Sequence, residues 1–160
     1  MVDYCRCCGA ILIKKKSVGH LKLATPFITE SEGLRLEVYK DSAGFPTIGY
    51  GHLLLPGEKF TKITKEKANE LLQNDLSIAD GAITQYVKVP VNNNQRAALL
   101  SLIFNIGRGN FVKSTLLKKL NEGNYQEAGD RFLRFVFSGG KKIQGLVKRR
   151  ERERELFFTA

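Results

Sequence analysis

The carboxylates Glu32 and Asp41 and the hydroxyl of Thr47 lie close together, with several glycines, in the segment from residue 32 to residue 52. Asp41 follows Glu32 by nine residues, and Thr47 follows Asp41 by six. Two carboxyl groups held apart by short structured segments are what acid/base hydrolysis of a glycosidic bond requires. One of them donates a proton to the leaving oxygen, while the other, ionised, activates water or attacks the sugar carbon. A surface loop without a chemical role has little reason to collect these residue types.

The surroundings of the two carboxyl groups in the sequence suggest which is the acid. Glu32 suits the proton donor because apolar residues flank it, and burial keeps a carboxyl group protonated near neutral pH. Asp41 opens a polar turn that suits an ionised partner, and the hydroxyl of Thr47 can hold a water. Sequence spacing does not give the distance between carboxyl groups, so inversion (roughly 6.5–9.5 Å) and retention (about 5 Å) both stay open. Taken singly, each residue also has a plain explanation as a surface charge, a turn former or a strand residue.

Taken together, this segment resembles the catalytic region of bacteriophage-type lysozymes, the endolysins of glycoside hydrolase family 24. The family pattern is Glu-Gly, then Tyr-x-Asp, then Gly-x-x-Thr-x-Gly-x-Gly-His. Here it is matched by Glu32-Gly33, by Tyr39-Lys40-Asp41 and by residues 44–52. The likeness covers about residues 24–158, because further stretches also match: residues 63–68, 94–107 and 145–157.

The resemblance implies a function and a role for each matching residue. It implies a lysozyme (muramidase) that hydrolyses the link between N-acetylmuramic acid and N-acetylglucosamine in bacterial peptidoglycan, without a cofactor. Glu32 would be the proton donor, Asp41 the second carboxylate and Thr47 the hydroxyl that positions water. The family generally inverts, which favours Asp41 as a base. The residues expected to contact the glycan are Gly51, Leu53, Phe104 and Thr115.

His52 ends the matching segment and has two interpretations. It could act as a ligand or base, but the family pattern implies a structural hydrogen bond to Asp75 on a long helix. Such a pair would raise the pKa of His52 and lower that of Asp75.

Arg149 and Arg150 also have two interpretations. They are either a solvated basic face of the last helix, or a place where one arginine reaches and orients Glu32. The second arrangement would favour the ionised acid and so oppose the effect of burial.

The sequence predicts an α+β, mostly helical, lysozyme-like two-lobed fold. Its small β-sheet N-lobe would span about residues 23–63, a connecting helix about 64–86, and a helical C-lobe about 90–158. We expect the ordered chain to begin near Leu23, with a short helix from Pro26 to Glu32. We also expect a hairpin or three-stranded sheet over residues 36–55. Further helices are expected to start at Thr64, at Asn92 or Asn93, at Ser114, at Tyr125 (running to Phe137) and at residue 143.

Residues 1–22 form a basic extension that we expect to be poorly ordered. Its cysteines, Cys5, Cys7 and Cys8, have only His20 nearby, and a zinc site needs four ligands, so no metal is expected. No apolar run reaches the ~20 residues of a membrane span or the ~7–15 of a secretory signal. We therefore expect a monomer in the host bacterial cytoplasm that is not inserted in the membrane. A membrane-permeabilising holin, which the family implies, would then give it access to the wall.

The net charge of +10 gathers at the two ends of the chain. Basic ends attract polyanions such as nucleic acid or an anionic cell wall. A nucleic-acid-binding module is the rival hypothesis, but the C-terminal arginines alternate with glutamates that repel phosphate, and no nucleic-acid motif is present. A catalytically dead wall-binding relative is a further alternative, which the intact Glu32, Asp41 and Thr47 oppose.

Overall fold

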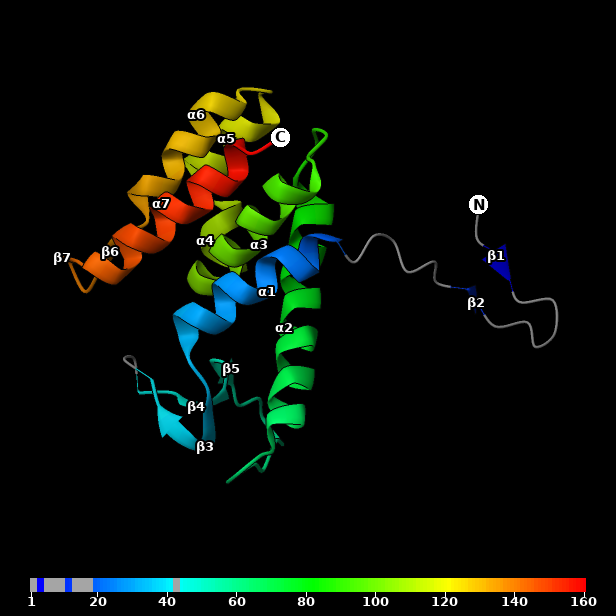
Figure 1. Cartoon of the computed structure of the whole chain (residues 1–160), viewed down its shortest axis with the longest axis vertical. Coiled ribbons are helices and arrows are strands. Elements are labelled where there is room, and N and C mark those ends of the chain that lie inside the picture. The colour runs from blue at the N-terminus through cyan, green and yellow to red at the C-terminus, as the bar shows by residue number, and fades with distance from the viewer. Residues whose placement is uncertain (1–2, 5–10, 13–18, 42–43) are drawn as a thin grey trace.

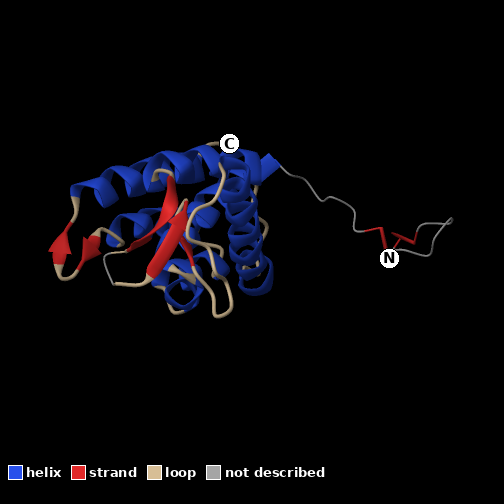
Figure 2. Ribbon diagram, turned by 90° about the horizontal axis from the view of Figure 1, so that it is seen from below, coloured by secondary structure: helices blue, strands red, loops and turns tan. Residues whose placement is uncertain are grey.

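The computed structural model describes residues 3–4, 11–12, 19–41 and 44–160. A small sheet lies beside the first half of a long helix, and the other helices gather around a buried central one (Figure 1). Seen from below, the strands lie in front of the helical lobe (Figure 2). The expected α+β, mostly helical, two-lobed lysozyme-like fold is confirmed. No helix among the described residues is long and apolar enough to cross a membrane.

The first helix begins earlier than the sequence predicted. In α1 (Gly19–Glu32), His20 is already buried and its Nε2 lies 3.1 Å from Asp80 Oδ1, so the predicted start near Leu23 was wrong. Pro26 lies inside the helix on an exposed position, where water can satisfy the carbonyl group that the missing N–H leaves open. Gly33, with a φ of 69°, ends the helix as predicted.

Of the extension before α1, the structure describes only two short paired strands. These are β1 (Asp3–Tyr4) and β2 (Ile11–Leu12), which run antiparallel. Cys5, Cys7 and Cys8 lie outside the described residues.

The predicted sheet has three antiparallel strands in the order β3-β4-β5. They are β3 (Arg35–Lys40), β4 (Pro46–Gly49) and β5 (His52–Leu53). Tyr39 pairs with Thr47, and Ile48 pairs with His52. This register brings Tyr39, Thr47 and His52 of the matched segment together on one small sheet.

The connecting helix α2 (Lys65–Tyr86) has the predicted cap, because the Thr64 side chain accepts a hydrogen bond from the Lys67 N–H. Its apolar face packs against the sheet and against α3 (Asn93–Ile106). Asn92 and Gln95 form a capping box at the start of α3. The stretch 97–103 of α3 is buried throughout, so α3 is the central helix that its nearly continuous apolar sequence predicted.

Four further helical segments complete the C-lobe. They are α4 (Arg108–Val112), α5 (Thr115–Asn121), α6 (Tyr125–Asp130) and α7 (Gln144–Phe158). The Ser114 side chain caps α5, as predicted.

The helix predicted from Tyr125 to Phe137 was wrong in its second half. After α6 the chain tightens into a 3-10 turn (Arg131–Arg134) and then forms a hairpin of β6 (Phe137–Ser138) and β7 (Lys141–Lys142). The hairpin turn consists of two glycines with φ of 55° and 75°, the conformation that a two-residue hairpin turn requires.

Candidate active site

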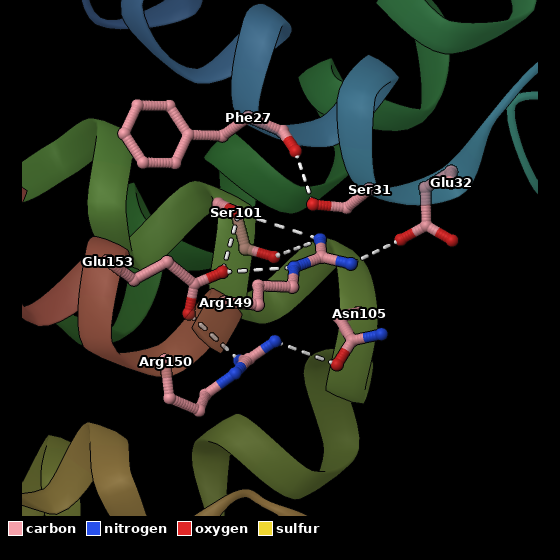
Figure 3. A network of polar contacts seen from close by, with 8 residues as sticks. All are labelled: Phe27, Ser31, Glu32, Ser101, Asn105, Arg149, Arg150 and Glu153. Atoms are coloured by element: carbon pink, nitrogen blue, oxygen red, sulfur yellow. Dashed lines mark hydrogen bonds and ion pairs between the residues drawn. The ribbon is translucent and has the colours of Figure 1, made fainter. Parts of the chain in front are cut away.

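Glu32 is the last residue of α1 and lies where the helix meets the sheet. Its Oε1 accepts a hydrogen bond of 2.6 Å from Arg149 Nη1 on α7 (Figure 3). Its Oε2 lies beside Gly51 in the β4–β5 turn, since a Cβ atom at Gly51 would be 3.7 Å from that oxygen. The carboxyl group therefore has a hydrogen-bond partner on α7 and a close neighbour in the β4–β5 turn.

The surroundings of Glu32 differ from those that the sequence predicted. The apolar flanking residues do not enclose the carboxyl group: Ile28 points into the core, and Leu34 is 37% exposed. Instead, Glu32 is paired with the buried Arg149 and keeps 24% of its side chain exposed. Of the two interpretations of the arginine pair, the solvated basic face was wrong, and the contact with Glu32 is present.

Asp41 and Thr47 lie on either side of the β3–β4 turn. Asp41 Oδ1 accepts a hydrogen bond of 2.8 Å from the Phe45 N–H. Thr47 is 3% exposed, and its Oγ1 donates to the Phe45 carbonyl oxygen at 3.1 Å. Phe45 thus supplies backbone partners to both side chains.

Tyr39, which precedes Asp41 by two residues, is within electrostatic reach of both carboxyl groups. Burial raises the pKa of its phenol, the charge of Arg35 opposes this rise, and the carboxylates of Glu32 and Asp41 add to it. Both carboxylates therefore act on one phenol. The sequence identified Tyr39 only as part of the matched segment.

The residues expected to contact a glycan fall into two groups. Gly51, Leu53 and Phe104 line one cavity of about 260 Å³ between the sheet and α3. Thr115 lines a separate cavity of about 830 Å³ in the C-lobe, together with Asn105. The structure therefore groups the first three residues at one cavity, with Gly51 beside Glu32, and places Thr115 at the other cavity.

His52 is held between two carboxylates. Its Nδ1 lies 2.8 Å from Asp75 Oδ2, and its Nε2 lies 3.0 Å from Glu58 Oε2. Burial lowers the pKa of His52, but the hydrogen bonds to Glu58 and Asp75 outweigh burial and raise it, as predicted. The prediction for Asp75 was wrong, because burial raises its pKa by more than His52 lowers it. Glu58 was missed, since nothing in its loop sequence marks it as a partner.

A buried network behind Glu32 was also missed. It joins Arg149, Arg150 and Glu153 of α7 to Ser101 and Asn105 of α3. The spacing held a signal, because residues 146, 149, 150, 153 and 157 recur at three- and four-residue intervals, which is one face of a helix.

The structure bears on the rival hypothesis of a phosphate-binding helix. Arg149 and Arg150 are buried, Arg152 pairs with Glu30 at 2.9 Å, and Arg154 pairs with Asp130 at 2.6 Å. These arginines of α7 are therefore already engaged within the protein.

The chain matches proteins of known type. The family model for phage lysozyme matches residues 29–153. The endolysin of Salmonella phage P22 is 47% identical over 136 residues, which cover 82% of this chain and 92% of that protein. A crystal structure of a P22 lysozyme mutant has a TM-score of 0.74 at 45% identity, covering 86% of this chain and 96% of the other. The muramidase domain of SpmX from Asticaccaulis excentricus has a TM-score of 0.78 at 32% identity, covering 87% and 97%.

This family match covers the site described above as well as the fold. It spans Glu32, Asp41 and Thr47, the three-stranded sheet, and the arginine pair of α7. The chain therefore belongs to the phage lysozyme family, and it is a glycoside hydrolase that degrades the peptidoglycan of bacterial cell walls.

Proposed function

We propose that this lysozyme is an endolysin that hydrolyses the β-1,4 bond between N-acetylmuramic acid and N-acetylglucosamine and so lyses the host cell. The observation that carries the proposal is the position of Glu32. Its carboxyl group is held by Arg149 and lies beside Gly51, which lines the same cavity as Leu53 and Phe104.

Glu32 is the proton donor in this proposal. Gly51 has no side chain, so a sugar ring can approach the backbone beside the Glu32 carboxyl group. A glycan that fills the cavity displaces water from Glu32, and loss of water favours the protonated form of a carboxyl group. The proton then passes to the glycosidic oxygen as the bond to the leaving sugar breaks.

Asp41 and Thr47 supply the water in this proposal. The Thr47 hydroxyl donates its hydrogen to the Phe45 carbonyl group, so its oxygen is left to accept a hydrogen bond from water. Asp41, oriented by the Phe45 N–H, takes the second proton of that water as a general base. Attack by this water on the face opposite the leaving group would invert the anomeric centre.

The cellular setting is part of the same proposal. The enzyme acts as a monomer, remains in the host cytoplasm until a holin permeabilises the membrane, and then reaches the wall. Its net charge of +10 raises its local concentration at an anionic wall.

The test is clearing of purified cell walls by wild type and by Glu32→Gln, which keeps the shape of the side chain but cannot donate the proton. Glu37→Gln is the control, because Glu37 is an exposed sheet residue whose side chain is 71% exposed. We expect Glu32→Gln to lose at least 100-fold in clearing rate with an unchanged circular dichroism spectrum, and Glu37→Gln to match wild type.

A folded Glu32→Gln enzyme that clears walls normally would refute the assignment of the donor. A wild-type protein that binds walls without clearing them would instead support the catalytically dead relative. The anomeric form of the first product, followed by NMR, tests whether the reaction inverts.

A further inference from the structure

Glu153 is a fully buried carboxylate that no step of the proposed mechanism uses. Its Oε1 accepts hydrogen bonds from Ser101 Oγ at 2.6 Å and from Arg149 Nε at 3.2 Å. Its Oε2 lies 3.0 Å from Arg150 Nη1. One carboxylate is therefore the common partner of two adjacent guanidinium groups on α7.

Each of these guanidinium groups also reaches a residue outside α7 (Figure 3). Arg149 Nη1 donates to Glu32 Oε1 at 2.6 Å, while its Nη2 donates to the Ser101 carbonyl oxygen at 3.2 Å. Arg150 Nη2 donates to Asn105 Oδ1 at 2.9 Å, and the amide nitrogen of Asn105 points away from Arg150. Asn105 lines the cavity of about 830 Å³.

Burial disfavours the charged forms of Arg150 and Glu153 in this network. Burial lowers the pKa of Arg150 to about 10, and burial raises the pKa of Glu153 against the opposing charges of Arg150 and Arg149. Among the described residues, Arg150 Nε has no hydrogen-bond partner. Replacing such buried ionic groups by apolar residues is often neutral or stabilising. What the charges provide here is a fixed direction for each guanidinium group.

We propose that Glu153 is a positioning residue for peptidoglycan hydrolysis, which holds Arg149 against Glu32 and Arg150 against Asn105. The inference rests on the proposed role of Glu32. Glu153 and Glu32 both bind Arg149, so the negative charge of Glu153 partly offsets the attraction between Arg149 and Glu32. Without the negative charge of Glu153, Arg149 would pair more strongly with the ionised Glu32, which would become a poorer proton donor.

The test compares Glu153→Gln with Glu151→Gln, the same substitution at an exposed position of the same helix. Initial wall-clearing rates are measured over a range of wall concentrations and pH values. We expect Glu153→Gln to lower apparent kcat at least 10-fold with apparent KM within about twofold, because displaced catalytic groups lose rate before binding. The alkaline limb of its pH profile should also move to lower pH, a shift that a merely structural role would not cause. Glu151→Gln should match wild type.

A folded Glu153→Gln enzyme with the kcat and pH profile of Glu151→Gln would overturn the inference. If Glu32→Gln is inactive in the same assay, the proposed function stands even though the inference about Glu153 fails. An active Glu32→Gln would overturn both the proposed role of Glu32 and the inference about Glu153.

Should Glu153→Gln fail to fold, Ser101→Ala provides the second test. This substitution removes the 2.6 Å hydrogen bond to Glu153 without changing any charge. We expect a several-fold loss of kcat with the alkaline limb in place, and a wild-type kcat would overturn the inference.

Discussion

The contacts of His52 with Asp75 and Glu58, which we call the histidine clamp, lead to a stability prediction with a definite pH dependence. A neutral imidazole can donate only one hydrogen, so hydrogen bonds to two ionised carboxylates require the protonated ring. The Leu55 N–H also donates to Glu58 Oε2, at 2.9 Å. His52 therefore ties β5 both to α2 and to the loop that follows β5.

The substitution His52→Asn removes both of these charge-assisted bonds. A hydrogen bond to a charged group contributes about 1.5–3 kcal/mol, and solvent reduces this because the Glu58 and Asp75 side chains are 27% and 25% exposed. We therefore expect the free energy of unfolding to fall by about 2–3 kcal/mol. For a chain of this size, about 2–4 °C of Tm corresponds to each kcal/mol, so Tm should fall by about 4–12 °C.

The pH dependence follows from the raised pKa of His52. The stabilisation is fully present below the pKa of histidine in the unfolded chain and is lost as pH rises through the higher pKa of the folded protein. The difference in Tm between wild type and His52→Asn should therefore be largest near pH 6 and smaller near pH 9. Thermal unfolding followed by circular dichroism measures both values.

The control is Lys62→Gln, which breaks an exposed pair with Glu37 and should change Tm by about 2 °C or less at either pH. A Tm difference for His52→Asn that stays constant or grows with pH would refute the reasoning. Because His52 is assigned a structural role, the folded variant should still clear cell walls at 25 °C, and complete loss of turnover would contradict that role.

Three further substitutions test other parts of the structure. Gly51→Ala forces a side chain into a φ of 88° and places a methyl group 3.7 Å from Glu32 Oε2. It should lower the free energy of unfolding by about 1–2 kcal/mol and slow wall clearing several-fold. An unchanged clearing rate would show that the glycan does not approach Gly51. Asn92→Ala breaks the capping box of α3 and should lower the unfolding free energy by about 1 kcal/mol in urea titrations, with clearing unchanged. Leu100→Ala empties a fully buried position of α3 and should cost about 2–5 kcal/mol in the same titrations; a smaller loss would mean that the core collapses around the cavity.

The parts of the fold that depend on local chemistry could be predicted from the sequence. Thr64 caps α2 with its own side chain, and Asn92 caps α3, because each needs only a partner three residues away. Gly33 ends α1 because glycine tolerates a φ of 69°. The alternation of residues 36–55 predicted the sheet, since successive side chains of a strand point to opposite faces.

The missed features depend on contacts between distant segments. Glu153 and Ser101 are 52 residues apart, and no local pattern states that they meet. The raised pKa of Asp75 could not be predicted from local sequence either. It is caused by burial, and the extent of that burial depends on how the sheet packs against α2. The helix predicted through residues 131–137 is a different case, because the glycine pair at 139–140 forms a two-residue hairpin turn, a local signal that outweighed helix propensity.

The separation of the two carboxyl groups depends on how the lobes are joined. Glu32 is fixed to the C-lobe through Arg149, whereas Asp41 directly follows β3 of the sheet, which the histidine clamp ties to α2. A carboxyl separation that leaves room for a water gives inversion, and a shorter one gives retention. Substituting Arg149 or His52 should therefore change the distance between the Glu32 and Asp41 carboxyl groups, and with it the stereochemical outcome. Both carboxyl groups would remain chemically intact. We therefore predict that Arg149 and His52 influence the stereochemical outcome through the carboxyl separation, without touching the sugar.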